Sequence, residues 1–139
     1  MRTLLIVTTL LGLEASAGTA QRGPYTPPRG SVERQMIMEA FRVPVTRQLG
    51  RTVVFNNVWM RVQNGWAFVQ AVPRSTEGRR VIDLDNPDCV NCTDNVVGLL
   101  QWRRDRWVVV AYQIAPGEYP YEWRRYRAPP AIFPWYGQR

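Results

Sequence analysis

The stretch that decides the fold is "TVVFNNVWMRVQNGWAFVQAVP", residues 52–73, in which two runs rich in valine and aromatic residues flank Asn64-Gly65. Asn-Gly between two such runs is the strongest short-range hairpin signal, because both central residues of the tight turn need a positive φ that Asn and Gly tolerate. The stretch therefore predicts a β-hairpin with strands over 52–63 and 66–73.

Side chains alternate between two faces along a strand, so the first run divides into two sets. One face carries Val54, Asn56, Val58, Met60 and Val62, and the other carries Phe55, Asn57, Trp59 and Arg61. Both sets contain large apolar groups. We therefore expect one face of the hairpin to cover a helix and the other face to be partly shielded as well.

The segments on either side of this hairpin predict the remaining elements. Downstream, "NVVGLLQW" (95–102) and "RWVVVAYQI" (106–114) flank the polar turn "RRDR" (103–106) and predict a second hairpin. Upstream, Ser31 is a helix N-cap and Gly50 a helix stop. Between them lies an apolar stripe at helical spacing, formed by Met36, Ile37, Ala40, Phe41, Val45 and Leu49.

Pro44 falls inside that helical stripe and cannot donate a backbone hydrogen bond, so it predicts a kink or a break into two short helices near Val43. One kinked helix followed by two hairpins predicts an α+β fold. The helix packs on a curved four-stranded antiparallel sheet, and an aromatic and arginine-rich C-terminal tail follows.

The order of the helix, the "RVQNGWAFV" hairpin, the "VVGLLQWRRDRWVVVAYQI" hairpin and the final "RAPPAIF" resembles a group of small exported bacterial proteins of unassigned function. Their architecture is similar to the cystatin-like and nuclear-transport-factor-2-like α+β folds. The resemblance covers roughly residues 30 to 133 and rests on strand patterns. It implies a fold and no activity, since such folds host isomerases, hydratases and binding modules alike.

The first twenty residues have the pattern of a secretory signal peptide. Arg2 precedes the apolar run from Leu4 to Leu13, and small residues allow cleavage after Ala17 or Ala20. We expect a flexible lead-in over 21–30 and a single domain over 31–139, with its tail at 116–139. The protein is then periplasmic or extracellular, with no integral membrane segment in the mature chain.

The chain is basic, with a formal net charge of +7 and 18 basic residues, all of them arginine. A basic exported protein meets anionic partners. We expect an anionic envelope polymer, a lipid headgroup or a partner protein rather than nucleic acid.

The stretch "DLDNPDCVNCTDN", residues 83–95, contains the two cysteines of the chain, Cys89 and Cys92. In an oxidising compartment a disulfide is their default state. A redox-active dithiol is the alternative, and Asp88 and Asp94 on both sides would blunt its reactivity. Calcium binding by the aspartates is a further alternative, but the loop lacks the EF-hand pattern. We expect a structural disulfide, no metal and no cofactor.

The chain contains no histidine, which excludes Ser-His-Asp and Cys-His catalysis. An enzyme would need a buried carboxylate paired with a tyrosine donor. Asp83, Asp94 and Tyr112 are the weak candidates, and the favoured interpretation of these residues is two turn caps and a core tyrosine. The leading hypothesis is therefore a non-enzymatic binding module. The alternative is a small isomerase or hydratase whose site lies in the cone of the sheet, the tapering space between the curved sheet and the helix.

The tail "EYPYEWRRYRAPPAIFPWYGQR", residues 118–139, mixes aromatic rings with arginines, as binding surfaces for anions, sugars or partner proteins do. The candidate binding residues are Tyr119, Tyr121, Trp123, Arg124, Arg125, Tyr126, Arg127 and Trp135. The alternative is a tail that packs on the open face of the sheet, with Ile132 and Phe133 covering Trp59 and Phe55 and the arginine heads reaching water.

Overall fold

The computed structural model describes residues 22–138; the expected signal peptide and the terminal Arg139 lie outside the described residues. The elements in order are α1 (Val32–Leu49), β1 (Val54–Gln63), β2 (Trp66–Arg74), β3 (Val96–Arg103), β4 (Arg106–Ile114) and the short 3-10 helices η1 (Tyr121–Tyr126) and η2 (Pro130–Ile132). The strands form one antiparallel sheet in the order β1-β2-β3-β4. The predicted α+β architecture of one helix on two hairpins is confirmed.

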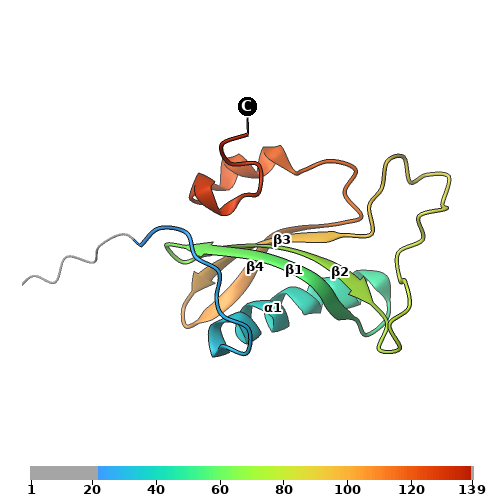
Figure 1. Cartoon of the computed structure of the whole chain (residues 1–139), viewed down its shortest axis with the longest axis horizontal. Coiled ribbons are helices and arrows are strands. Elements are labelled where there is room, and N and C mark those ends of the chain that lie inside the picture. The colour runs from blue at the N-terminus through green and yellow to red at the C-terminus, as the bar shows by residue number, and fades with distance from the viewer. Residues whose placement is uncertain (1–21, 139) are drawn as a thin grey trace, which may run out of the picture.

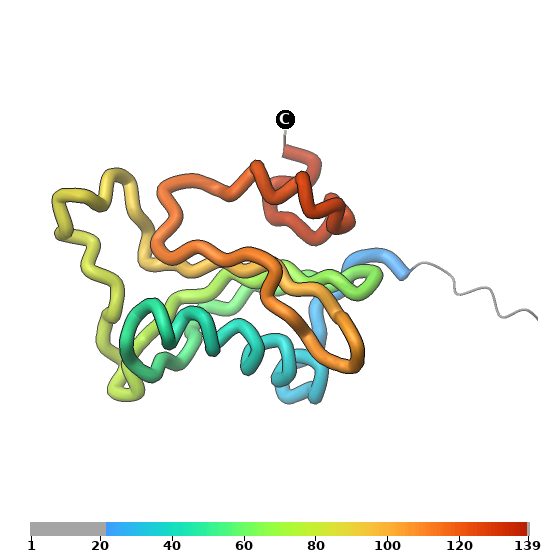
Figure 2. Tube along the Cα trace, turned by 180° about the vertical axis from the view of Figure 1, so that it is seen from behind, coloured from blue at the N-terminus to red at the C-terminus, as the bar shows by residue number. Residues whose placement is uncertain are grey.

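The sheet has a cover on each side. Figure 1 shows α1 below the curved sheet and the C-terminal segment with η1 and η2 above it, and Figure 2 shows the same three layers from behind. Each cover has its own hydrophobic cluster. Ile37, Phe41 and Val45 of α1 pack on one face, while Trp123, Phe133 and Trp135 pack on the other.

The helix begins and ends where the sequence predicts. The Ser31 hydroxyl oxygen accepts a hydrogen bond from the Arg34 amide at 3.2 Å, and Gly50 ends the helix with a φ of 68°. The helix is continuous through Pro44, so the expected break into two helices near Val43 is wrong. Phe41 and Val45 lie on either side of Pro44 in the sequence and both are fully buried, which holds the two halves of the helix on one surface.

Gly98 of β3 sets how closely α1 approaches the sheet. A Cβ atom at this position would lie 2.5 Å from Cε2 of Phe41. The phenylalanine ring therefore occupies the space that a larger residue in β3 would need. Among residues 22–138 the only buried polar or charged residue is Ser75.

A bulge in β1 changes which residues face the helix. Asn56 pairs with Val72 and Trp59 pairs with Gln70, so the strand holds one extra residue between these pairs, and Asn57 has a φ of 49°. The bulge shifts the alternation. Phe55 consequently stacks on Phe41 of α1, with ring centroids 5.3 Å apart. The expectation that Phe55 shares a face with Trp59 is therefore wrong.

Candidate functional site

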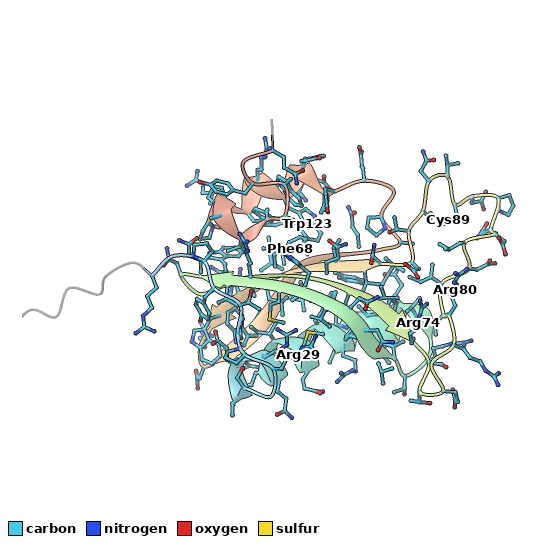
Figure 3. All side chains as sticks on the ribbon, viewed as in Figure 1. Arg29, Phe68, Arg74, Arg80, Cys89 and Trp123 are labelled. Atoms are coloured by element: carbon cyan, nitrogen blue, oxygen red, sulfur yellow. A yellow bond between two sulfur atoms is a disulfide. The ribbon has the colours of Figure 1, made fainter. Side chains whose placement is uncertain are left out.

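The C-terminal tail is docked on the sheet face opposite α1. Phe68 of β2 is fully buried at the centre of an aromatic cluster, and its ring centroid lies 5.6 Å from those of Phe133 and Trp135 and 6.1 Å from that of Trp123. Figure 3 shows Phe68 and Trp123 facing each other between the sheet and the tail. Trp59 packs edge-on against Phe68 at 5.8 Å. The tail covers Trp59, whereas the bulge places Phe55 on the other face.

The docked tail divides the predicted binding residues into three groups by their exposure. Trp123 and Trp135 are only 3% and 5% exposed, so they form part of the core and offer no open stacking surface. Tyr119 and Tyr126 are half-buried. The exposed members are Tyr121, Arg124, Arg125 and Arg127. A binding role for these exposed residues stays a prediction.

The exposed tail arginines lie beside tyrosine rings of their own segment. The Arg124 guanidinium lies 5.9 Å from the Tyr121 ring centroid, and that of Arg125 lies 5.0 Å from the Tyr126 centroid. Arg125 also donates a hydrogen bond of 3.1 Å to the Tyr126 hydroxyl, which raises the pKa of this guanidinium. These arginines thus pack along the outside of the aromatic cover with their charges in water.

The weak catalytic candidates occupy separate structural positions. Asp83 is exposed and accepts a hydrogen bond of 3.0 Å from the backbone N–H of Asp85, as a turn residue does. Asp94 is paired with Arg74 at 3.1 Å. Tyr112 lies on the outer strand β4 and is 36% exposed. None of the three is buried, so the pair of buried carboxylate and tyrosine that the isomerase hypothesis requires is not formed by them.

The cysteine loop is closed as a disulfide. The Sγ atoms of Cys89 and Cys92 are at bonding distance, and the Cα atoms are 5.3 Å apart. This bond fits an oxidising, exported location. Figure 3 places Cys89 on the long loop between β2 and β3, well away from α1.

Within residues 22–138, no group of three or more Cys, Asp or Glu residues is placed to hold a metal ion. No helix in that part of the chain combines the length and the apolar character that a membrane crossing requires.

Three arginines from separate elements line a pocket beside the β1 bulge. Arg29, Arg34 and Arg74 line it together with residues 55–58 of β1, and its volume is about 460 Å³. We call it the arginine pocket. Arg29 comes from the turn before α1, Arg34 from the first turns of α1 and Arg74 from the end of β2. Arg29 and Arg74 can be followed from their elements in Figure 3.

Local hydrogen bonds fix two of the three arginines. Arg34 donates from Nη1 to the carbonyl oxygen of Pro27 at 3.1 Å, and Arg74 donates from Nη2 to Asp94 at 3.1 Å. Nη1 of Arg74 is buried and has no hydrogen-bond partner. A buried donor without an acceptor is costly, so the site would gain from an acceptor that reaches it.

The lining of the arginine pocket contains no carboxylate. Within residues 22–138, ion pairs are formed by Arg42 with Glu39 and by Arg74 with Asp94, so Arg29 and Arg34 are in neither. The other polar groups of the lining are the amides of Asn56 and Asn57, which donate hydrogen bonds. Charge and hydrogen-bond donors at this site both favour an anion.

Sequence reasoning did not find this pocket. Its arginines are separated by up to 45 positions, and only the fold brings them together. The one local signal is Asn56-Asn57 between the apolar residues 53–55 and 58–60, because Asn tolerates the positive φ of a bulge better than most residues.

No protein-family model, no curated protein and no solved structure matches this chain.

Proposed function

We propose that this protein is an exported, non-enzymatic binding module that holds an anionic group of a cell-envelope component in the arginine pocket. The observation that carries the proposal is the convergence of Arg29, Arg34 and Arg74 on one pocket whose lining has no carboxylate. The net charge of +7 would draw such a ligand toward the protein from a distance.

The chemistry of the pocket favours a phosphate group or another compact oxyanion. A guanidinium group is planar and permanently charged, and it binds two oxygens of such an anion at once. The amides of Asn56 and Asn57 can add neutral hydrogen bonds to the remaining oxygens. A phosphate-bearing polymer presents many such groups along its length. A protein with one basic pocket could bind it at any of them.

Isothermal titration calorimetry with inorganic polyphosphate tests the proposal. We expect binding that weakens as NaCl is raised from 50 to 500 mM, because added salt screens the attraction. The double variant R29A/R34A should bind about 10-fold more weakly or worse, since it removes two hydrogen-bonding charges from the pocket. The matched control is R124A/R125A, which removes the same charge from the exposed tail.

The comparison of the two variants decides the outcome. Affinity that falls only in R29A/R34A supports the arginine pocket. Equal losses in both variants would assign the binding to overall charge, and a loss confined to R124A/R125A would assign it to the tail. Affinity that stays flat across the salt range would remove the electrostatic basis of the proposal.

A further inference from the structure

A second pocket lies between the sheet and the beginning of the C-terminal tail. Its volume is about 230 Å³, and it is lined by one side chain of β2, the start of β3 and residues 116–119. Val97 and Tyr119 of the lining belong to the aromatic cluster under the tail, so the pocket is on the sheet face opposite α1. Figures 1 and 2 both show the segment after β4 beside the loop between β2 and β3. We call this hollow the tail pocket.

Hydrogen bonds hold the outer wall of the tail pocket in place. The Thr93 hydroxyl donates to the Pro116 carbonyl oxygen at 3.0 Å, and the Ala115 N–H donates to the Asn95 carbonyl oxygen at 2.8 Å. Gly117 lies against the cysteine loop, since a Cβ added to it would be 3.4 Å from two carbonyl oxygens of that loop. The pocket is therefore a fixed part of the fold.

Three side chains offer unused hydrogen-bonding atoms to the tail pocket. Gln70 and Asn95 are half-buried, and Glu118 is exposed. Within residues 22–138, none of the three side chains forms a hydrogen bond with another protein group. Each amide offers a carbonyl acceptor and an NH₂ donor, and the carboxylate adds further acceptors. A ligand with several hydroxyl or amide groups would complete these hydrogen bonds.

The charge of the lining distinguishes the tail pocket from the arginine pocket. No arginine lines it, and its one charged side chain is Glu118, which repels an oxyanion. The net charge of +7 in turn repels a cationic ligand. The rest of the lining is apolar or aromatic, with Val97, Pro116 and the Tyr119 ring. An apolar wall with a few convergent polar groups is typical of a site for a small neutral molecule.

We propose that the tail pocket binds one neutral, N-acetylated sugar ring of a glycan. An acetamido group presents one C=O and one N–H, which complement the amide of Gln70 or Asn95, and its methyl group suits Val97. The ring hydroxyls donate to the Glu118 carboxylate, and the C–H face of the ring packs on Tyr119. Pockets for drug-sized ligands have volumes of roughly 300 to 1,000 Å³, so the smaller tail pocket suits a single ring.

This inference does not rest on the arginine pocket. The two pockets share no lining residue. A neutral sugar also predicts the opposite salt dependence, because screening does not act on an uncharged ligand. Sugar affinity should therefore stay flat over the salt range in which polyphosphate binding weakens. A failure of polyphosphate binding would leave the sugar result unchanged, so the two proposals fail separately.

An amide NMR titration with tri-N-acetylchitotriose tests the inference. We expect a Kd of about 1 mM, with shift changes at Asn95, Val97 and residues 117–119. The variant Gln70→Leu keeps a side chain of similar size without the amide and should bind about tenfold more weakly. The matched control is Gln101→Leu, which makes the same change at the other end of β3, outside the pocket, and should bind like the wild type.

The deacetylated trimer, chitotriose, separates a sugar site from a cation site. It has the same three rings, but ammonium groups replace the acetamido groups. We expect it to bind more weakly than the acetylated trimer, because it lacks the group that pairs with the amides and because the protein is positively charged.

Three results would overturn the inference. One is the absence of shift changes at about 20 mM of the acetylated trimer. Another is an equal loss of affinity in Gln70→Leu and Gln101→Leu. The third is equal or tighter binding of the deacetylated trimer, which would assign the pocket to a cation held by Glu118. If Gln70→Leu fails to fold, the wild-type shift map decides the question, because changes confined to residues outside 93–97 and 116–119 would contradict the inference.

Discussion

Two arginine-rich regions of the protein, the tail and the arginine pocket, differ in how their charges are brought together. In the tail, Arg124, Arg125 and Arg127 are neighbours in the sequence and lie on the outside of an aromatic cover whose tryptophans face inward. In the arginine pocket, Arg29, Arg34 and Arg74 come from three separate elements and line one hollow without a carboxylate. Arginines beside aromatic residues in a sequence can thus lie on the outside of a core layer, whereas the three pocket arginines, far apart in the sequence, are brought together only by the fold.

The largest expected effect tests the structural role of the tail. Phe68→Ala removes the ring on which the tail aromatics pack and should lower the free energy of unfolding by about 3 to 5 kcal/mol. Urea denaturation would measure the loss, and limited proteolysis should then cut within 116–139. Phe68→Leu is the milder control. If the Ala variant kept its stability and a protected tail, the account of the tail as a core layer would be wrong.

The opposite face of the sheet offers a matching test of the α1 layer. Gly98→Ala places a Cβ against the Phe41 ring and should cost about 1 to 3 kcal/mol, measured by thermal or urea unfolding. Phe41→Leu makes room at the same place, so the double variant should lose less than the sum of the single losses. Strictly additive losses would show that the two residues are not in the close contact described.

Removing the disulfide should have a smaller effect. Cys89→Ser together with Cys92→Ser reopens a short loop and should cost about 2 kcal/mol or less by the loop-closure relation. Neither cysteine lines the arginine pocket, and Asp94, which pairs with Arg74, lies two residues beyond Cys92, so polyphosphate affinity should change by no more than about twofold. A large loss of binding in this variant would show that the loop contributes to the site.

The contribution of Arg74 to the arginine pocket can be tested by removing its ion-pair partner, Asp94. Asp94 pairs with Arg74 and so offsets part of the positive charge at the pocket. Asp94→Asn frees that guanidinium and should raise polyphosphate affinity by about two- to fivefold, in line with the energy of a partly exposed ion pair. Calorimetry at 50 mM NaCl measures this change. An unchanged or lower affinity would show that Arg74 takes no part in binding.

Much of the fold could be predicted from particular residues. Asn64-Gly65 and the alternating runs on both sides located the first hairpin, and Ser31 and Gly50 located the ends of the helix. The continuity of α1 through Pro44 could not be predicted, because tertiary packing outweighs the missing hydrogen bond. The bulge at Asn57 could not be predicted either. Because one added residue moves every side chain on one side of it to the other face of the sheet, Phe55 faces α1 instead of sharing a face with Trp59.

The candidate site was less predictable than the fold. Trp123 and Trp135 were named as binding candidates beside the alternative of a tail packed on the sheet, because sequence alone cannot distinguish an aromatic ring that packs inward from one that binds a ligand. Arg29, Arg34 and Arg74 carry no motif, and their proximity depends on the pairing of β1 with β2 and on the position of α1.

The measurement that tests the central claim most directly is an amide NMR titration of the protein with inorganic polyphosphate. The account predicts the largest shift changes at Asn56, Asn57 and the first turns of α1, with little change across residues 121–127. Changes concentrated in residues 121–127, with the bulge and the start of α1 unaffected, would contradict it.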